Sequence, residues 1–443
     1  TNGKPVLLTS AGKAQEIKST QTGATVTEAV GVAHEVDQYG YYGTYQSEII
    51  NIGNDKVMVC WRGSNSYLMG RVGTVDGTNK TITWGTTQTL ISENSNQGCA
   101  IGYDPVEDAI GCFKYRGAVG DWECFKMTVS GTTITVGTQV QLTWSNYNTL
   151  NCPIKLKYDP DQQQLVCITR SGASGYYTIA MAFSVTGTNM AGVHSAKEST
   201  TQGYGSSSYE DGFDYDTVNN KWVSAITGNY SSGVGQIKAF CVTNSGSAFT
   251  FGSVSNLGVD NSTAPISVSY NPDAGKFLCT YTNSTSGVGA NDAVAQVLSL
   301  SGTTITGGNL VQVCQDDTSP FLSSMYNKTA KKHVLVCRDN SGATTMTNIY
   351  NGTISGTTST WSGNTASADI QINNVTAMQR ASITYDEIST EDEASVVVLL
   401  MDQSDSGSDP APFDAYVYNP PQVPQTVYNF SATSNDYLGV ASE

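Results

Sequence analysis

The sequence predicts an all-β fold, a seven-bladed β-propeller with four-stranded blades. A Tyr-Asp or Tyr-Asn motif recurs every 55–59 residues, each copy being followed by a short apolar segment. A glycine-centred turn, written SGTTIT at both Ser130–Thr135 and Ser301–Thr306, recurs with nearly the same period. Only 14% of residues are charged, against ~25% in typical domains, while Ser, Thr, Gly, Val and Tyr are abundant. The tyrosines of the motif are Tyr103, Tyr158, Tyr215, Tyr270, Tyr326 and Tyr385.

Each repeat is interpreted as four short strands. A first strand leads into the Tyr, and the Asp-Pro or Asn-Pro pair turns the chain, because Asx side chains favour turn initiation. A second strand follows, such as Gln164–Thr169, and then a third, such as Tyr176–Val185. The SGTT turn makes a hairpin into a fourth strand, such as Thr133–Leu142. Four strands in a unit of this length are typical of a propeller blade.

The seventh unit lacks an SGTT turn and a fourth strand, ending at Phe413–Pro420. The segment Ala24–Val36 has the length and pattern of the missing strand. We predict that it pairs with the strand containing Tyr416 and Tyr418, because such closure leaves no open edge in the ring. The seven units begin near Ser47, Gln97, Cys152, Tyr209, Ala264, Phe321 and Ser382.

Three parts are therefore expected along the chain. Residues 1–23 form an N-terminal β extension for assembly, and 24–420 form the propeller, with 24–36 completing its last blade. Residues 421–443 form a proline-containing linker and a C-terminal β extension.

Charge and hydropathy exclude several partners. The formal charge of −16 would repel a phosphate backbone or an anionic membrane surface, so neither nucleic acid nor membrane is an expected partner. The longest apolar run, Ala394–Met401, is far shorter than the ~20 residues of a membrane span. The sequence begins without an initiator Met or a signal peptide, so we expect a processed chain or the ordered part of a longer one.

The ten cysteines are not expected to form a disulfide framework. Equivalent positions in separate blades lie too far apart for a disulfide, so the regularly placed cysteines are interpreted as small buried residues assembled in a reducing cytoplasm. The regular positions are Cys60, Cys112, Cys167, Cys279 and Cys337. One pair remains open among the irregular cysteines. These are Cys99, Cys124, Cys152, Cys241 and Cys314.

A group of arginines and aromatics follows the second strands and suggests a ligand-binding rim. Four of the six arginines occupy this position, and an aromatic follows three of them. Such a rim would bind sugars or acidic groups by stacking and bidentate hydrogen bonds. The alternative, which we favour, is a repeated loop clamp in which Arg bonds the backbone carbonyls of a neighbouring blade. The residues are Arg62, Tyr67, Arg116, Trp122, Arg170, Tyr176 and Arg338.

The sequence contains no recognisable catalytic, metal or cofactor motif. The dispersed aspartates of the YDP turns and of Asp211–Asp216 are interpreted as turn formers and a solvated strand face, since no calcium loop is present. His34 lies in HEVDQ, which lacks the second His of a zinc site. There is no nucleophile elbow, phosphate loop or C-x-x-C pair. We therefore expect no cofactor, no metal and no enzymatic activity.

The repeat pattern YDP-x5-VC-x-x-R-x-G, followed by VSGTTITxG, resembles the propeller repeats of tail-fibre and tail-tube-tip proteins of marine bacteriophages and related viruses. The resemblance covers about Ser47–Pro420. The flanks Gly3–Ile17 and Asn435–Glu443 resemble the two ends of small β modules in phage decoration and fibre proteins. We expect these flanks to pair into one small module.

The resemblance implies a non-enzymatic virion structural protein that is assembled in the host cytoplasm. Its expected partners are other virion or filament subunits, bound through the terminal segments, and copies of itself in a homo-oligomer. Host-surface glycans are the candidate ligands of the propeller. The alternative is a secreted lectin-like propeller or a subunit of another extracellular filament. A third class, the sialidase-like glycosidases, is disfavoured because S-x-D-x-G-x-x-W turns are missing.

Overall fold

The fold is described from a computed structural model of the chain. The described residues are 5–8, 14–16, 21–22, 28–40, 47–63, 65–93, 97–116, 121–142, 155–170, 177–202, 212–228, 235–260, 266–283, 292–314, 322–339, 346–362, 370–372, 378–385, 395–402, 411–421, 426–427 and 437–440. Among them, no helix is long and apolar enough to cross a membrane.

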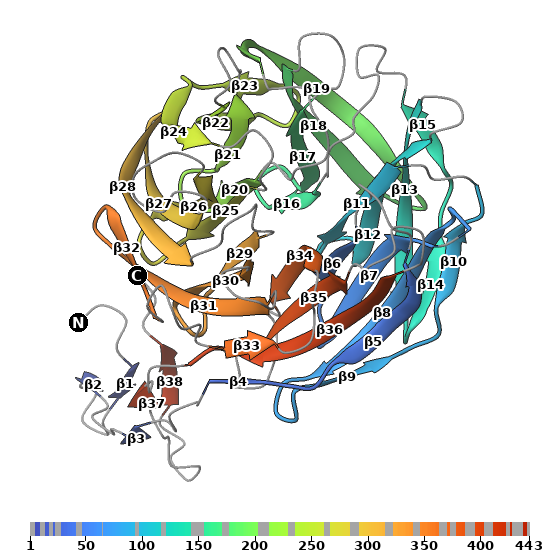
Figure 1. The fold of residues 1–443 in the computed structure, drawn as a ribbon, viewed down its shortest axis with the longest axis horizontal. Coiled ribbons are helices and arrows are strands. Elements are labelled where there is room, and N and C mark those ends of the chain that lie inside the picture. Colours follow the sequence, from blue (N-terminus) through green and yellow to red (C-terminus); the bar gives the residue numbers. More distant parts are fainter. Residues whose placement is uncertain are drawn as a thin grey trace. The chain divides into compact units, whose positions relative to one another are not determined.

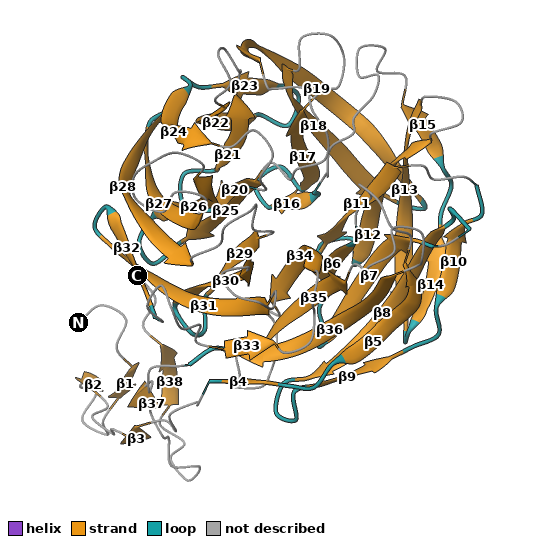
Figure 2. Cartoon of the chain, viewed as in Figure 1, coloured by secondary structure: helices purple, strands orange, loops and turns teal. Residues whose placement is uncertain are grey.

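Seven antiparallel sheets form a closed ring of blades around a central axis (Figure 1), which confirms the predicted seven-bladed propeller. The described elements are strands and the loops between them (Figure 2). The chain runs from an inner first strand to an outer fourth strand in each of blades 1 to 6, so antiparallel neighbours follow each other in sequence. In five blades the fourth strand is broken into two pieces that both pair with the third strand.

The first three blades come from the first half of the chain. Blade 1 contains β6 (Glu48–Asn51), β7 (Lys56–Arg62), β8 (Leu68–Asp76), β9 (Thr81–Trp84) and β10 (Gln88–Ile91). Blade 2 contains β11 (Gln97–Asp104), β12 (Ala109–Arg116), β13 (Asp121–Ser130), β14 (Thr133–Val136) and β15 (Val140–Leu142). Blade 3 contains β16 (Lys157–Asp159), β17 (Gln164–Arg170), β18 (Tyr177–Thr186) and β19 (Asn189–Gln202).

The remaining blades follow in the same order. Blade 4 contains β20 (Gly212–Asp216), β21 (Lys221–Gly228), β22 (Gly235–Asn244), β23 (Phe249–Phe251) and β24 (Ser255–Asp260). Blade 5 contains β25 (Ser267–Asn271), β26 (Lys276–Asn283), β27 (Asp292–Ser301) and β28 (Thr304–Cys314). Blade 6 contains β29 (Leu322–Asn327), β30 (Lys332–Asp339), β31 (Met346–Ser355), β32 (Thr358–Trp361) and β33 (Ile370–Ile372). Blade 7 contains β34 (Met378–Tyr385), β35 (Val396–Asp402) and β36 (Ala411–Asn419), with β4 (Ala29–Val30) and β5 (His34–Gly40) as its outer strand.

The outer strand of blade 7 confirms the predicted closure by the N-terminal segment. Val30 pairs with Tyr418, and His34 pairs with Ala415. Gly31 lies between the two pieces, where a Cβ atom would overlap the backbone carbonyl of Lys80, so the close approach requires glycine.

The repeated turns have the geometry expected from their residues. Ser130 pairs with Thr133, and Ser301 pairs with Thr304, so the SGTT segments are two-residue hairpin loops. The first loop residue is a glycine at positive φ, +63° at Gly131 and +61° at Gly302. The turn interpretation of SGTTIT is therefore confirmed.

The Asp or Asn of each described Tyr-Asx motif caps its turn. The Oδ1 atom of Asp159 accepts hydrogen bonds from the backbone N–H groups of Asp161 and Gln162, each at 3.1 Å. The corresponding residues Asp104, Asp216, Asn271 and Asn327 accept equivalent bonds. In the described part of the chain, no group of three or more His, Cys, Asp or Glu residues is placed to hold a metal ion.

Seven clusters of buried apolar side chains stabilise the ring, and each lies between two adjacent blades. The cluster between blades 7 and 1 contains Val36 of the closing strand, Ile49 and Trp61 of blade 1 and Val397 of blade 7. Because apolar burial is the main favourable term in folding, these seams are the core of the propeller. The nine described cysteines are free thiols and all are buried, as expected, while Cys152 lies outside the described residues.

The terminal segments form a second compact unit, Thr1–Glu28 with Pro421–Glu443, while Ala29–Pro420 forms the first. In the terminal unit, β1 (Pro5–Leu8) pairs with both β2 (Ala14–Glu16) and β38 (Tyr437–Val440). A second pair joins β3 (Gln21–Thr22) to β37 (Thr426–Val427). The two ends of the chain therefore share one small β module.

Candidate binding site in the central channel

A cavity of about 590 Å³ lies on the propeller axis and is lined by the first strands of all seven blades. The residues one and three positions before the repeat tyrosine line it in most blades, because alternate residues of a strand share one face. The turn residues Pro105, Pro160 and Pro272 also line it, so the cavity extends to the face that carries the Tyr-Asx turns.

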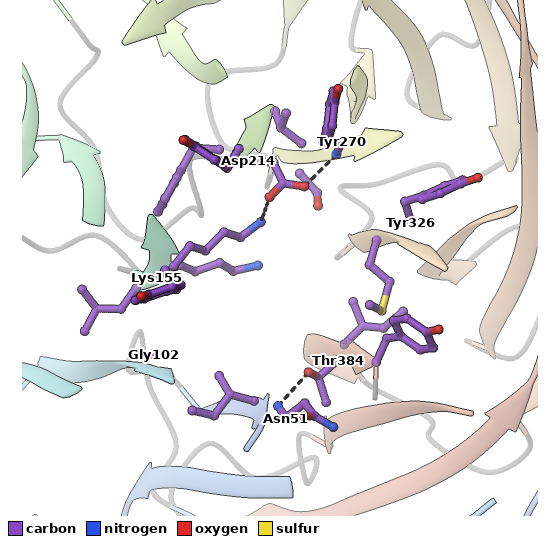
Figure 3. Close-up of a pocket in the computed structure, with 18 of the residues that line it drawn as sticks. Asn51, Gly102, Lys155, Asp214, Tyr270, Tyr326 and Thr384 are labelled. Atoms are coloured by element: carbon purple, nitrogen blue, oxygen red, sulfur yellow. Dashed lines mark hydrogen bonds and ion pairs between the residues drawn. The ribbon is translucent and has the colours of Figure 1, made fainter. Parts of the chain in front are cut away.

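Three of the five charged residues of the cavity lie on blades 3 and 4, while Glu48 lines it from blade 1 and accepts the backbone N–H of Ile101. The Nζ atom of Lys157 lies 2.8 Å from Oδ1 of Asp214, and both side chains are partly exposed. Asp214 is held in place because its Oδ2 accepts the backbone N–H of Tyr270 at 2.6 Å. Lys155 extends into the cavity from the same strand region (Figure 3), and Lys328 lines it from blade 6.

Hydroxyl groups line the opposite side of the cavity and also tie neighbouring blades together. The Oγ1 atom of Thr384 in blade 7 accepts the backbone N–H of Asn51 in blade 1 at 2.9 Å (Figure 3). Ser267 in blade 5 and Ser324 in blade 6 have their Oγ atoms 3.1 Å apart. The cavity therefore offers ammonium, carboxylate and hydroxyl groups, which suit a polar ligand.

Two of the repeat tyrosines that line the cavity direct their hydroxyl groups away from it. Figure 3 shows the rings of Tyr270 and Tyr326 directed outward from it. The hydroxyl of Tyr326 donates to Oδ2 of Asp273 in the preceding blade at 2.6 Å. Burial, together with Asp273, raises the pKa of Tyr326, and burial with Asp216 raises that of Tyr270. Both phenols are therefore neutral at physiological pH, and the hydroxyl of Tyr326 connects blades 5 and 6.

Tyr103 makes its contact within its own blade. Its hydroxyl donates to Oδ1 of Asp108 at 2.8 Å. Burial and this carboxylate raise the pKa of Tyr103 to about 12. The phenol is therefore neutral at physiological pH.

Asp159 shows how the motif carboxylates are used. Its Oδ1 caps the turn, and its Oδ2 accepts hydrogen bonds from Trp222 Nε1 at 3.2 Å and Asn244 Nδ2 at 3.0 Å in blade 4. The side chain is almost fully buried. Asp216 is similarly buried and caps its own turn, so the solvated face expected for Asp211–Asp216 is wrong at this residue; Asp211 lies outside the described residues.

The arginine and aromatic rim lies on the other side of the propeller from the tyrosine turns. Second strands run antiparallel to first strands, so the arginines at their ends are remote from the Tyr-Asx turns. Arg62 is buried and donates from Nη2 to Ser66 Oγ at 2.7 Å, within its own loop. This contact is to a serine hydroxyl of the same loop, and the predicted clamp onto carbonyls of a neighbouring blade stays a prediction.

The other predicted rim residues have mixed placements. Trp122 is buried in the seam between blades 2 and 3 and stacks on Phe113 at 4.4 Å, so it offers little surface to a ligand. Tyr67 is partly exposed. The backbones of Arg116, Arg170 and Arg338 end or nearly end their second strands, whereas Tyr176 lies outside the described residues.

Lys155, Lys157 and Asp214 were not predicted from the sequence as site residues. The signal for them was present, because the residue before the repeat tyrosine is Gly102, Lys157, Asp214, Ser269, Met325 or Thr384 in successive blades. Placed on a propeller, that position forms a ring around the axis. A lysine and an aspartate in adjacent blades at this position indicate an ion pair in the channel.

No family model matches the chain, and no curated protein matches it. Solved structures with a similar fold include the β-propeller domain of the trilobed protease from Pyrococcus furiosus, which has an open velcro topology. It is 9% identical, with a TM-score of 0.43, and the match covers 89% of this chain and 97% of that one. The polysaccharide lyase Uly1 is 10% identical, with a TM-score of 0.45 and coverage of 90% and 99%. The NanB sialidase of Streptococcus pneumoniae is 11% identical, with a TM-score of 0.43 and coverage of 90% and 70%.

The expectation that this chain is not an enzyme is corrected by these similarities. Propellers matched over most of this chain include a lyase and a sialidase. Carboxylates that act in catalysis need only be close in space, and a sequence motif is not required. At about 10% identity the similarities concern the fold, and they assign no reaction to this chain.

Proposed function

We propose that this protein is a ligand-binding propeller that recognises an acidic carbohydrate in its central channel. The observation that carries the proposal is that three lysines, Lys155 and Lys157 in blade 3 and Lys328 in blade 6, line the channel of a chain of formal charge −16 and outnumber its two carboxylates, Glu48 and Asp214. Lysines are scarce in this protein, and these three lie on the lining of one cavity. A local cationic site in an acidic molecule favours ligands whose negative charge is placed to meet it.

The other lining groups suit a sugar. The carboxylate of Asp214 accepts hydrogen bonds from ligand hydroxyls, while lysine ammonium groups donate to a sugar carboxylate or sulfate. Ser and Thr hydroxyls on the facing blades donate and accept. A volume of about 590 Å³ lies within the range of ~300–1,000 Å³ that is usual for small-ligand sites.

We further propose that the propeller is a component of a virion tail or fibre. The repeat and flank resemblances described above support this assignment, and the separate β module made by the two ends of the chain provides a surface for attachment to other subunits. A subunit of another extracellular filament is the alternative. The genomic neighbours discriminate between them: capsid, portal and terminase genes beside this one support the virion, and their absence supports the alternative.

The binding proposal is tested on a glycan array with the wild-type protein and two variants. Lys157→Met removes the channel ammonium, and Lys197→Met removes an exposed ammonium from β19, outside the cavity lining. Loss of one charge-assisted hydrogen bond of ~1.5–3 kcal/mol weakens binding by about 10- to 150-fold. We expect that loss for Lys157→Met and wild-type binding for Lys197→Met.

Two outcomes contradict the proposal. One is equal binding by the two variants, and the other is no preference of the wild-type protein for acidic over neutral glycans. Chromatography of each bound glycan after incubation with the protein separates retention from turnover. Cleaved products that disappear with Lys157→Met or Asp214→Asn would identify the same cavity as a catalytic site.

A further inference from the structure

Two buried cysteines meet at the seam between blades 5 and 6. Cys314 ends β28 in blade 5, and Cys337 lies in β30 in blade 6. Their Sγ atoms are 2.9 Å apart, and both side chains are fully buried in the same apolar cluster, with Leu322 and Ala293. Cys337 occupies a position that recurs in several blades, whereas Cys314 does not. Cysteines at equivalent positions of different blades lie apart, but these two occupy different positions and meet at one seam.

The geometry places this pair close to a covalent bond. A disulfide bond is about 2.05 Å long, so the two sulfur atoms are about 0.9 Å from bonding distance. Rotation of the two side chains about their χ1 torsions is the movement that would close this gap. Cys314 pairs with Ala293 beside a register shift between β27 and β28, and Cys337 pairs with Leu322 in a regular register, so both cysteines are anchored in their sheets.

We propose that Cys314 and Cys337 form a disulfide that covalently joins blades 5 and 6 once the protein leaves a reducing compartment. The oxidant is a low-molecular-weight disulfide such as oxidised glutathione. One cysteine thiolate attacks a sulfur of the oxidant, forming a mixed disulfide and releasing one glutathione thiolate. The second cysteine thiolate then attacks the protein sulfur and releases the second glutathione, so two protein thiols are oxidised and one glutathione disulfide is reduced.

Burial determines when the reaction occurs. An oxidant cannot reach either sulfur in the closed seam, so exchange takes place during folding or when the seam opens. The bond then restrains the unfolded chain and stabilises the closed ring. A protein that assembles with free thiols in the cytoplasm thus acquires a covalent link outside the cell. This inference is independent of ligand binding in the channel.

The test is refolding of the full chain in a buffer of reduced and oxidised glutathione, followed by acid quenching, alkylation, trypsin digestion and mass spectrometry. Trypsin releases Cys337 in the peptide 333–338 and Cys314 in the peptide 277–328, which also contains Cys279. We expect the two peptides to be recovered as one species, with fragment ions assigning the link to Cys314. The link should be absent in Cys314→Ala and present in Cys241→Ala, whose thiol is buried in a different seam.

A second measurement compares the urea midpoints of oxidised and reduced protein. We expect a higher midpoint for the oxidised wild type and no redox-dependent shift for Cys314→Ala. If that variant fails to fold, the wild-type comparison with and without dithiothreitol still decides the matter. Recovery of peptide 333–338 fully alkylated from refolded protein would overturn the proposal. The proposal would also be overturned if the only disulfide detected joined two of the cysteines Cys60, Cys99 and Cys112, which lie together between blades 1 and 2.

Discussion

Closure of the ring depends on one short N-terminal strand, and two valines of this segment allow a matched test. Val36 in β5 is fully buried in the seam between blades 7 and 1, whereas Val32 in the same closing segment is 69% exposed. Blade 1 also holds this strand by polar contacts. Arg71 donates to the carbonyl oxygen of Val36 at 2.6 Å, and Trp61 Nε1 donates to Asp37 Oδ2 at 2.8 Å. The seam is thus a specific junction between the two ends of the propeller.

The substitution Val36→Ala removes two buried carbon atoms. At ~0.8 kcal/mol for each buried methylene, the lost transfer free energy is ~1.6 kcal/mol, and the remaining cavity adds ~1 kcal/mol. We therefore expect the free energy of unfolding to fall by about 2–3 kcal/mol. The substitution Val32→Ala removes the same atoms from a solvent-exposed position, where changes are usually within ~0.5 kcal/mol.

The assay is urea unfolding monitored by tryptophan fluorescence, with limited proteolysis as a second readout. Trp61 lies in the affected seam, so its exposure reports the opening of the ring. Val36→Ala should lower the urea midpoint and speed cleavage, while Val32→Ala should match the wild type. Equal effects of the two substitutions, or no effect of Val36→Ala, would refute the conclusion that the N-terminal strand closes the cooperative core.

Two further predictions concern buried polar groups in other seams. Burial lowers the pKa of His333 from its ordinary value of 6.5 to about 3, so the unfolded chain binds a proton that the folded protein excludes, and stability falls as pH drops below 6.5. Between pH 7.5 and pH 5, the wild type should lose about 2 kcal/mol more than His333→Gln in urea unfolding, and equal losses would contradict this. Asp159→Ala should cost about 3–5 kcal/mol, because it removes a turn cap and leaves Trp222 and Asn244 without their shared carboxylate. Asp76→Ala, which removes a turn cap at the surface, should cost much less, and a similar cost for both would show that the link between blades contributes nothing.

The architecture was predictable because each blade contains the same turns, and these turns are determined by residues adjacent in sequence. Gly131 and Gly302 adopt the positive φ that their hairpins need, and Asp159 caps the turn that its motif indicated. The closing strand was predictable from an omission, since the seventh unit lacked a fourth strand and Ala24–Val36 supplied the pattern. The turns depend on residues that are neighbours in sequence. The closing strand depends on a single pairing, and without that pairing blade 7 would have an open edge.

The candidate site was not predictable in the same way, because it depends on which strand positions face the central axis of the ring. The regular arginines drew attention to the ends of the second strands, yet Arg62 is engaged within its loop and Trp122 packs inside a seam. The sequence shows that Lys157 and Asp214 precede motif tyrosines, but only the assembled ring shows that this position faces the axis. The meeting of Cys314 and Cys337 depends on the same three-dimensional stacking of neighbouring blades.

The repeat therefore separates structural positions from positions that are free to carry function. In the described copies the Asx residue caps its own turn, and the hydroxyls of Tyr103 and Tyr326 donate to a carboxylate of their own or the preceding blade. The preceding position varies from Gly102 through Lys157 and Asp214 to Met325, and the contacts that its residues make differ from blade to blade. Of the six residues that precede a repeat tyrosine, five line the cavity, and their differences make the lining asymmetric. That asymmetry places the ion pair of Lys157 and Asp214 at one side of the channel, and it gives a symmetric ring the means to hold an asymmetric ligand in one orientation.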